Sequence, residues 1–443
     1  MHPIQEIVAA QKRGIPAGIW SCCSANPYVL RAALLRGKAT NTPVLIESTA
    51  NQVDQYGGYS GMRPTEFYAF VQSLAAQAGV DASMVLLGGD HLGPLTFAHL
   101  PEEKAMAEAE ELVRQYVLAG FTKIHLDTSM RLLDDPKDRP FGDEVIARRG
   151  ARLCRVAEDA YLERLADYPN AQAPVYIIGS EVPIPGGTQE EEEHLKVTSP
   201  SAAEKTIETF EAAFAALSLS DAWQRVTGVV VQPGVEFGDA QVDEYDREAA
   251  RALTNVLSRY PCLVFEGHST DYQTKEKLRE MVEDGIAILK VGPALTFALR
   301  EALFALAHME RELCDSTYLS NFEAVLDAAM LQNPVYWKKH YHGDEAALHF
   351  KRRFSFSDRA RYYLPAPAVS SSISRLMKNL REAGIPLSLL SQYMPLQYLR
   401  VTEGVLSNDP EALLLDHIGG CIDTYLYATR SAAQFTTDTM KGA

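Results

Sequence analysis

The sequence predicts an α/β protein, a (β/α)8 barrel with a helical C-terminal extension, and three observations support this prediction. Eight short apolar segments alternate with longer helical patterns over roughly the first 310 residues. Several of these segments are apolar throughout and rich in valine and isoleucine, as expected of parallel strands that are buried on both faces. Beyond residue 310 the strands stop, and the sequence becomes helical and aromatic. Eight strands, each followed by a helix, match the architecture of a (β/α)8 barrel.

The predicted elements follow one another in a regular order, after an amphipathic helix in the first residues. The predicted strands are Ala17–Trp20, Val44–Glu47, Met84–Leu87, Lys123–Leu126, Val175–Ile178, Gly228–Val231, Cys262–Phe265 and Ile286–Val291. The predicted helices are Pro27–Arg36, Thr65–Ala78, Glu102–Ala119, Asp143–Arg164, Ser201–Ala216, Glu248–Ser258 and Thr274–Asp284. We therefore expect residues 1–310 to form the barrel and residues 311–443 to form a helical region packed on it. An open doubly wound sheet is the alternative, but no GxGxxG motif follows the first strand to indicate a dinucleotide site.

Composition and charge exclude several classes of function. The chain has 443 residues, of which 47% are hydrophobic, and a formal net charge of −16. An acidic chain without a basic stripe is not typical of proteins that bind nucleic acid or anionic membranes. No apolar run reaches the roughly 20 residues that span a bilayer. The 6 cysteines are scattered without a CxxC pair, so we expect a cytoplasmic protein with reduced thiols.

Polar side chains follow most of the predicted strands, at the end where (β/α)8 enzymes place their active sites. In chain order they are Glu47, Ser48, Thr49 and Asn51, then Asp90 and His91, Asp127, Ser180 and Glu181, Gln232 and Glu236, and Glu266, His268, Ser269 and Asp271, with Lys290 in the last strand. Each one alone is explained by turn chemistry or helix capping. Together they place several carboxylates at one end of the barrel, and uncharged packing alone would not compensate that many negative charges. A divalent cation bound by nitrogen and oxygen ligands would neutralise them.

Several long strings of the sequence also carry a resemblance to a known family. They include SCCSANPYVLRAAL, VLIESTANQVDQYGGYSGM, LGGDHLGP, AGFTKIHLD, GSEVPIPGG, VVVQPGVEFG, EGHSTDYQT and SDRARYY, and the resemblance extends from about residue 18 to about residue 400. On these strings the chain resembles the Z-type, accessory subunits of tagatose-1,6-bisphosphate aldolase. Members of that family have long been called non-catalytic, and some carry the label tagatose 6-phosphate kinase.

The family is similar in turn to the catalytic class II aldolases, which are zinc-dependent barrels. This resemblance implies that Asp90 is an acid–base carboxylate and that His91 is a metal ligand. It also implies that the aldolases' glutamate ahead of a glycine pair corresponds to Glu181, which precedes Gly186 and Gly187.

The sequence departs from the class II aldolases at two metal-ligand positions. After the sixth strand, where those enzymes carry a histidine and a glycine, this chain has Gln232 and Glu236. After the seventh strand it reads Glu266-Gly267-His268, so either Glu266 or His268 takes the ligand position. The three-histidine zinc set is therefore not intact, and harder oxygen ligands would admit manganese or magnesium as well as zinc.

These arguments define the expected site. We expect catalytic roles for Asp90, Asp127 and Glu181, substrate binding by Ser48, Asn51, Gln232, Ser269, Lys290 and Arg359, and a divalent metal such as zinc or manganese held by His91 with Glu181, Glu236, Glu266 and His268. Arg359 and its neighbour Arg361 would hold a substrate phosphate by forked hydrogen bonds, with a surface or interface pairing as the alternative.

Two functions remain open at this stage. The first is the role that the resemblance implies, an accessory subunit that stabilises a separate catalytic class II aldolase in galactitol- or N-acetylgalactosamine-type sugar breakdown. The second is a metal-dependent ketose or ketose-phosphate 4-epimerase that acts on its own, since a metal beside an acid–base carboxylate supports reversible carbon–carbon cleavage. Self-association is expected as well as, or in place of, the aldolase partner. A kinase is disfavoured, because neither a GxxxxGK[ST] loop nor a protein-kinase signature occurs.

Overall fold

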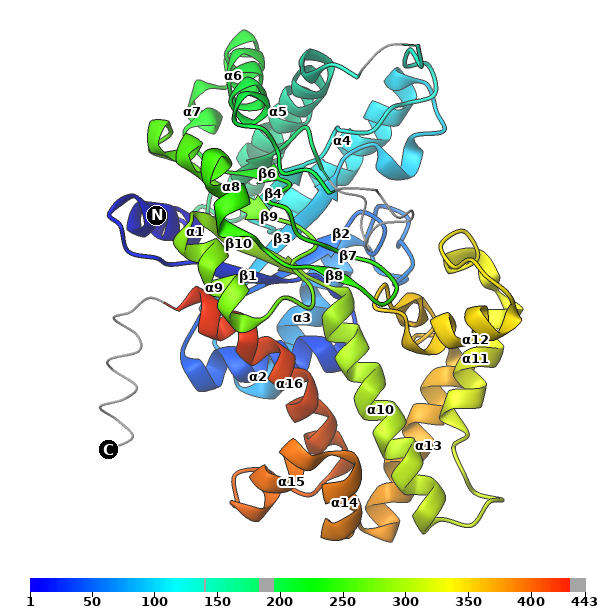
Figure 1. Ribbon diagram of the computed structural model, residues 1–443. Coiled ribbons are helices and arrows are strands. Elements are labelled where there is room, and N and C mark those ends of the chain that lie inside the picture. The colour runs from blue at the N-terminus through cyan, green and yellow to red at the C-terminus, as the bar shows by residue number, and fades with distance from the viewer. Residues whose placement is uncertain (139–140, 183–194, 431–443) are drawn as a thin grey trace.

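The computed structural model describes residues 1–138, 141–182 and 195–430. Eight parallel strands close into a barrel in the order β1-β10-β9-β6-β5-β4-β3-β2 (Figure 1). They are β1 (Ile19–Cys22), β2 (Val44–Thr49), β3 (Val85–Leu92), β4 (Lys123–Leu126), β5 (Val175–Ile178), β6 (Val226–Val231), β9 (Val264–Gly267) and β10 (Ile286–Val291). A separate antiparallel ribbon consists of β7 (Glu236–Phe237) and β8 (Val242–Asp243). The predicted barrel is confirmed, with a strand at each predicted place.

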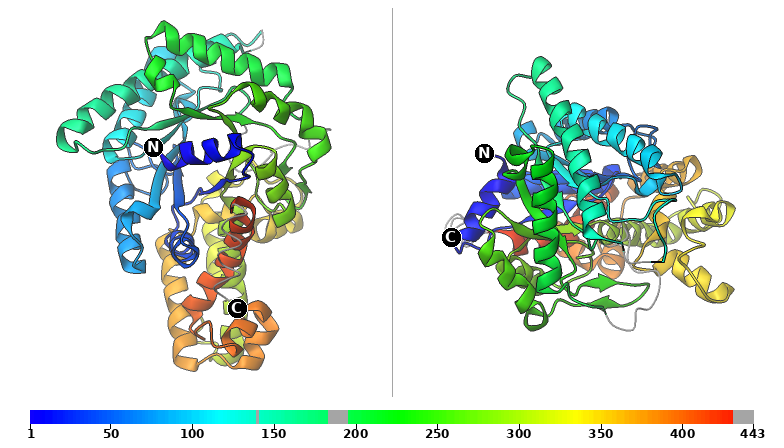
Figure 2. Two further views of the ribbon diagram at one scale, coloured as in Figure 1. Left: turned by 90° about the vertical axis from the view of Figure 1, so that its left-hand side faces the viewer. Right: turned by 90° about the horizontal axis from the view of Figure 1, so that it is seen from above.

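Helices surround the barrel and continue into a C-terminal region that projects from it (Figures 1 and 2). The helices up to the last strand are α1 (Pro3–Lys12), α2 (Pro27–Thr40), α3 (Pro64–Ala78), α4 (Glu102–Ala119), α5 (Asp143–Asp167), α6 (Pro200–Ala216), α7 (Ser220–Trp223), α8 (Arg247–Thr254) and α9 (Lys275–Glu283). The later ones are α10 (Pro293–Leu313), α11 (Phe322–Gln332), α12 (Glu345–Phe354), α13 (Pro367–Ala383), α14 (Leu387–Tyr393), α15 (Pro395–Thr402) and α16 (Pro410–Thr429). Among the described helices, none is long and apolar enough to cross a membrane.

The last helix of the described chain returns to the barrel. Helix α16 packs against α2 and α9, which flank it around the barrel, and against α10 along its length. The phenol of Tyr425 in α16 donates a hydrogen bond of 2.8 Å to the carbonyl oxygen of Thr270, just after β9. The chain therefore completes its ring of helices with a segment that comes long after the last strand. The division at residue 310 stays a prediction, and α10 runs across it.

The barrel interior is apolar at one end and polar at the other. Residues near the starts of the strands, among them Leu45, Val175 and Val264, form a buried apolar cluster with Ile4 and Val8 of α1. Helix α1 therefore closes the N-terminal end of the barrel. Near the other ends of the strands, the buried side chains are largely charged or polar.

Strand β3 extends further than the sequence predicts. The glycine pair Gly88-Gly89 is typical of a turn, yet β3 runs through it to Leu92. Gly88 faces the interior, where an added Cβ would lie 2.8 Å from Cγ of Glu47. Gly88 therefore leaves space for the buried carboxylate of Glu47, and it does not mark a turn.

Candidate metal centre at the barrel mouth

The end of β3 departs from regular strand geometry at Asp90 and His91. The register against β4 shifts between Gly89 and Leu92. His91 has a φ of 51°, in the left-handed region that residues other than glycine rarely adopt. Such a conformation costs on the order of 1–3 kcal/mol and persists only where its surroundings hold it. At this irregularity, consecutive side chains no longer have to point to opposite faces of the sheet. Asp90 and His91 are both buried, and both line the same pocket.

Four buried side chains bring potential ligand atoms together at this end of the barrel. They are Asp90 of β3, His125 of β4, Glu266 of β9 and His268, which follows β9 directly. One ligand atom from each residue lies within 4.8 Å of those from the others. Two imidazoles and two carboxylates form a mixed donor set that suits zinc, manganese and similar divalent ions.

His125 provides the test of whether these residues fit a metal ion. Its Nδ1 lies 2.9 Å from Oδ1 of Asp90, whereas its buried Nε2 has no hydrogen-bond partner in the described part of the chain. Two tautomers are compatible with these contacts. Either Nδ1 accepts the backbone N–H of His91 at 3.2 Å, or it donates its proton to Asp90. In the second tautomer Nε2 keeps its lone pair, which is the usual arrangement for a metal-binding histidine. A buried polar atom without a partner costs about 1–3 kcal/mol. A cation at Nε2 would offset that cost, so the residues fit a divalent ion.

Two buried lysines link the carboxylates of this region. Nζ of Lys123 lies 2.8 Å from Oε1 of Glu47 and 2.7 Å from Oε2 of Glu266. Nζ of Lys290 lies 2.8 Å from Oε2 of Glu47 and 3.1 Å from Oδ2 of Asp90. Each lysine therefore bridges two carboxylates, and together they fix the positions of Glu266 and Asp90.

The charges of this network do not balance while its histidines are neutral. The carboxylates are those of Glu47, Asp90, Asp127 and Glu266, and the ammonium groups are those of Lys123 and Lys290. Uncompensated buried charge is costly. Either protonated histidines or a divalent cation would neutralise the excess of negative charge, and the second agrees with the donor set around His125.

Asp127 acts on the site through His91. Its Oδ2 lies 2.7 Å from Nδ1 of His91, while Oδ1 accepts hydrogen bonds from the backbone N–H and the hydroxyl of Ser129, at 3.1 and 2.7 Å. The other ring nitrogen of His91, Nε2, lies 3.7 Å from Oδ2 of Asp90. Asp127 therefore orients His91 with its Nε2 toward Asp90. His91 is not one of the four clustered residues, so its role as a metal ligand stays a prediction.

The surroundings set the protonation states of the site. Burial opposes ionisation of Asp90, but His91 and Lys290 outweigh it and hold the pKa of Asp90 well below its usual value. Burial likewise opposes protonation of His91, but Asp90 and Asp127 raise the pKa of His91 above its ordinary value. Burial lowers the pKa of His268 to about 4. At neutral pH the site thus presents an ionised Asp90 beside a neutral His268.

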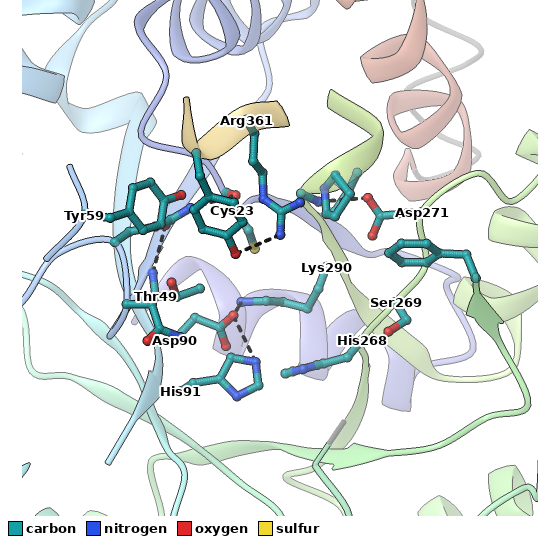
Figure 3. Close-up of a pocket in the computed structure, with 17 residues that line it drawn as sticks. Cys23, Thr49, Tyr59, Asp90, His91, His268, Ser269, Asp271, Lys290 and Arg361 are labelled. Carbon is teal, nitrogen blue, oxygen red and sulfur yellow. Dashed lines mark hydrogen bonds and ion pairs between the residues drawn. The ribbon is translucent and has the colours of Figure 1, made fainter. Parts of the chain in front are cut away.

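The cluster opens into a polar pocket at the barrel mouth (Figure 3). The cavity has a volume of about 80 Å³. Its lining includes the sequence-predicted Asn51, Asp90, His91, His268, Ser269 and Lys290. The pocket is therefore bordered both by ionised groups and by uncharged hydrogen-bonding groups, which can orient a small polar molecule.

Three of the predicted substrate-binding residues lie outside this pocket. The hydroxyl of Ser48 lies 2.9 Å from the phenol oxygen of Tyr116 in α4, so Ser48 faces the helix layer. Oε1 of Gln232 accepts a hydrogen bond of 2.8 Å from the backbone N–H of Gly234 and stabilises the loop after β6. Arg359 is buried but does not line the pocket. The predicted roles of these residues have no support from their positions.

Two of the predicted metal ligands also lie apart from the four-residue cluster. Glu181 is exposed, and its Oε2 accepts a hydrogen bond of 2.5 Å from the hydroxyl of Thr198. The glycine pair expected after it, residues 186–187, lies outside the described residues. Glu236 is buried in β7, and burial raises its pKa to about 7. Of the predicted ligands, Glu266 and His268 belong to the cluster and His91 adjoins it.

Sequence reasoning missed two residues of the site, both of them in β4. His125 lies within the apolar run KIHL, where a histidine resembles an ordinary core residue. Lys123 begins the same strand, and a lysine in an otherwise buried strand was the available signal. Of the two arginines considered for a substrate phosphate, Arg361 lines the pocket and Arg359 does not. Only the folded chain brings Arg361 to the barrel mouth, because more than 60 residues separate it from the last strand.

Comparison with known proteins identifies the family. The family model described as "D-tagatose-1,6-bisphosphate aldolase subunit GatZ/KbaZ-like" matches residues 4–430. The chain belongs to this family. The resemblance seen in the sequence is thereby confirmed, as is the expected membership of this GatZ/KbaZ-like chain among tagatose-bisphosphate aldolase subunits.

Solved structures similar to this GatZ/KbaZ-like chain fall into two groups. The crystal structure of a probable tagatose 6 phosphate kinase from Sinorhizobium meliloti 1021 is 44% identical, with a TM-score of 0.85, and the match covers 93% of this chain and 100% of that one. The YdjI aldolase from Escherichia coli K12 is 12% identical, with a TM-score of 0.40, over 86% of this chain and 96% of that one. A fructose-bisphosphate aldolase from Campylobacter jejuni is 16% identical, with a TM-score of 0.40, over 86% and 91% of the two chains. Similarity as low as that of the two aldolases says nothing about chemistry.

Proposed function

We propose that this aldolase-subunit barrel keeps a metal and ketose site of its own, which catalyses the 4-epimerisation of a ketose or ketose phosphate. One observation supports the proposal most strongly: the buried cluster around Asp90 opens directly into the polar pocket at the barrel mouth. Buried charges are costly to desolvate and often give no net stability. A protein that acted only as a scaffold would have no evident use for them.

The cluster residues would divide the work of such a site. His125, His268 and Glu266 would hold a divalent ion, with Asp90 at its edge and His91 as a further donor. When bound, the ion would supply Lewis-acid polarisation of the ketose carbonyl.

Asp90 is positioned to act as the general base. Its low pKa keeps it ionised at neutral pH, so it can accept the proton of the C4 hydroxyl of a ketose in the pocket. As this proton leaves, the C3–C4 bond breaks, and its electron pair moves toward the carbonyl end of the sugar. The resulting aldehyde fragment then presents its opposite face, the bond re-forms, and the proton returns to O4. Lys290, whose Nζ lies 3.1 Å from Asp90 and which lines the pocket, offsets negative charge during this exchange.

The substitution Asp90→Asn tests this proposal. It keeps the size of the side chain but removes the base, so we expect 4-epimer formation to fall about 100- to 10,000-fold. The assay follows conversion of fructose and tagatose, free and phosphorylated, with manganese, zinc or nickel. Asp221→Asn is the matched control. It removes an exposed carboxylate in α7 and should retain activity. Absence of turnover by the wild type on every substrate and metal would contradict the proposal.

Family membership favours a second role, in which the chain stabilises a separate catalytic class II aldolase subunit in galactitol- or N-acetylgalactosamine-type breakdown. The position of Gln232 supports it, because this side chain binds a loop amide where the catalytic enzymes carry a metal-binding histidine. The test is co-purification with a catalytic subunit and the half-life of that subunit's activity on warming. Asp90→Asn should protect the partner as well as the wild type does. A catalytic subunit that neither binds nor gains stability would exclude this role.

A further inference from the structure

We infer that Tyr362 is a second acid–base residue of the barrel-mouth pocket, and that it serves the side of the bound ketose that Asp90 does not reach. The inference rests on the proposed 4-epimerisation and adds a catalytic residue to it. Tyr362 ends the short helix η5 (Arg359–Tyr362), which the C-terminal region brings to the pocket. Tyr362 and Asp90 both line the cavity, but they come from different parts of the fold.

The stereochemistry of 4-epimerisation requires proton transfer at two places. The two epimers differ only in the side of C4 that carries the hydroxyl group. When C1 to C3 stay fixed, O4 of one epimer and O4 of the other therefore point to opposite walls of the pocket. A group that exchanges a proton with O4 must lie within about 2.6–3.2 Å of it. Asp90 is fixed by His125 and Lys290, at 2.9 and 3.1 Å, so it serves one epimer and the other needs a second group.

Tyr362 lies on the wall of the pocket that the C-terminal region forms. Its phenol oxygen accepts a hydrogen bond of 3.1 Å from Nη2 of Arg361. Figure 3 shows Arg361 across the pocket from Asp90 and His91. The phenol oxygen is therefore held beside Arg361, whereas the carboxylate of Asp90 is held at the end of a barrel strand.

Two arginines make the phenol of Tyr362 more acidic than usual. The guanidinium carbons of Arg361 and Arg359 lie 4.5 and 6.0 Å from the centroid of the Tyr362 ring. The phenols of Tyr59 and Tyr336 also pack on this ring, each with its centroid 4.8 Å away. Burial opposes ionisation of Tyr362, but Arg361 and Arg359 outweigh it and lower the pKa of Tyr362 below its usual value. A phenol that gives up its proton more readily is better suited to acid–base catalysis.

Other ionisable groups of the pocket are less suited to donate this proton. Burial raises the pKa of Tyr59 well above its usual value and that of Cys23 to about 12, so both hold their protons tightly. Burial raises the pKa of Asp271 to about 6, so Asp271 is ionised at neutral pH and has no proton to give to O4. Tyr362 is protonated at neutral pH and has arginines beside it that stabilise the anion it leaves.

The proton balance assigns each group its step. From the first epimer, Asp90 accepts the O4 proton, and the C3–C4 bond breaks with its electron pair moving from C3 toward the carbonyl. The aldehyde then turns over, so that its oxygen points to Tyr362. The electron pair at C3 attacks C4, and O4 takes the phenol proton of Tyr362. Asp90 has now gained one proton and Tyr362 has lost one, and exchange with water restores both. The reverse reaction uses the tyrosinate as the base and the protonated Asp90 as the acid.

The segment that carries Tyr362 is fixed to the barrel side by a buried ion pair. Asp358, whose φ of 43° lies in the left-handed region, accepts hydrogen bonds from Nε of Arg300 at 2.9 Å and from the hydroxyl of Thr296 at 2.6 Å. Both donors belong to α10, which begins directly after the last barrel strand. A phenol held in this way keeps a constant position relative to O4, as efficient proton transfer requires.

Rapid-quench measurements distinguish the two acid–base groups. Metal-loaded protein in excess is mixed with fructose or tagatose, or with their phosphates, and quenched with acid, and the aldehyde from C3–C4 cleavage is trapped as its hydrazone. We expect the wild type to cleave both epimers. Tyr362→Phe should cleave one epimer at nearly the wild-type rate and the other about 100- to 10,000-fold more slowly, and Asp90→Asn should show the opposite pattern. Tyr318→Phe, which removes an exposed phenol, should match the wild type on both epimers.

The pH dependence is a readout that a purely structural role of Tyr362 would not change. Cleavage through Asp90 should not vary above neutral pH, because Asp90 is already ionised. Cleavage through Tyr362 requires the tyrosinate, so its rate should rise with pH and level off above the pKa of Tyr362. 3-Fluorotyrosine at position 362 keeps the ring and the hydroxyl group but lowers the phenol pKa, so it should shift this rise to lower pH. It also decides the matter if Tyr362→Phe does not fold, and an unshifted rise would overturn the inference.

An NMR titration of the metal-free protein tests the acidity of Tyr362 without turnover. Tyrosines labelled with 13C at Cζ are titrated, and the resonance that disappears in Tyr362→Phe or shifts with 3-fluorotyrosine is that of Tyr362. We expect it to titrate below the usual tyrosine pKa of about 10, and Arg361→Gln should raise its pKa. Titration at or above the usual value would contradict the role of the two arginines.

The quench results separate failure of the inference from failure of the proposed function. If Tyr362→Phe slows both epimers equally or neither, or if Asp271→Asn gives the selective loss in its place, the inference is overturned while the ketose site stands. If the wild type forms the 4-epimer without any aldehyde, the inference is likewise overturned. If the wild type forms neither aldehyde nor 4-epimer, the proposed function fails together with the inference.

Discussion

At the scale of single residues, Lys123 determines how the buried charges are arranged. Its ammonium group is fully buried and contacts both Glu47 and Glu266 at ion-pair distance. Through Glu266 it supports one of the residues of the metal cluster, and through Glu47 it is connected to Lys290. The sequence shows a lysine in a buried strand but not which carboxylates it meets, because those come from strands on either side of the barrel.

The substitution Lys123→Met measures the importance of this charge. It leaves two buried carboxylates with too few partners, so we expect a loss of about 3–5 kcal/mol in the free energy of unfolding. Chemical denaturation followed by circular dichroism gives the value. Lys205→Met, which removes a largely exposed ammonium 3.2 Å from Asp143, should cost at most about 1 kcal/mol. Equal stabilities of the two variants would show that Lys123 does not hold the carboxylates in place.

Glu236 should make stability depend on pH. Burial raises its pKa from 4.5 to about 7, so the folded protein binds a proton more tightly at this site than the unfolded chain does. Stability contributed by this proton is complete below about pH 4.5 and is lost as the pH rises through about 7. In metal-free protein, Glu236→Gln should therefore be more stable than the wild type at pH 8, by up to about 3 kcal/mol, and similar to it at pH 4.

Unfolding midpoints at a series of pH values check this prediction. Glu211→Gln, which changes an exposed carboxyl group on α6, serves as the control and should follow the wild-type profile. If Glu236→Gln also follows the wild-type profile, Glu236 is ionised without cost in the folded protein.

At the scale of elements, the end of β3 has one feature that the sequence predicts and one that it does not. The apolar run identifies the strand, and the dipeptide Asp90-His91 identifies the chemistry, because polar residues at the end of a buried strand are conspicuous. The pattern cannot show that the strand continues through its glycines with a shifted register, since this depends on β2 and β4. For the same reason His125 was missed: its direction depends on the barrel and not on its neighbours in the sequence.

Gly93 allows a test of the close packing at this strand end. An added Cβ would lie 1.7 Å from the backbone oxygen of Asp127, too close for any side chain. We expect Gly93→Ala to displace the turn that holds His91 and Asp127, with a loss of several kcal/mol, by analogy with overpacked cores. Gly420→Ala on α16, where nothing lies within 4 Å, should be neutral or slightly stabilising. Thermal unfolding compares the two, and equal melting temperatures would contradict the packing argument.

At the scale of the whole molecule, the site combines the barrel with the region that follows it. The strands supply Asp90, His125 and Glu266, whereas Arg361 comes from the C-terminal region. The sequence predicts the barrel because eight apolar runs repeat in it, and it predicts a helical extension because the runs stop. It does not predict that α16 returns to complete the helical ring, because this return depends on contacts between residues far apart in the chain.

The metal content of the purified protein tests the central claim most directly. Protein produced with added zinc or manganese, desalted and analysed by mass spectrometry of its metals, should hold a stoichiometric divalent ion. His125→Ala and His268→Ala remove two of the clustered donors and should lose most of that ion while remaining folded. His99→Ala, which removes an exposed histidine, should retain it. A wild type that retains no divalent ion, or variants His125→Ala and His268→Ala that retain all of it, would contradict the account.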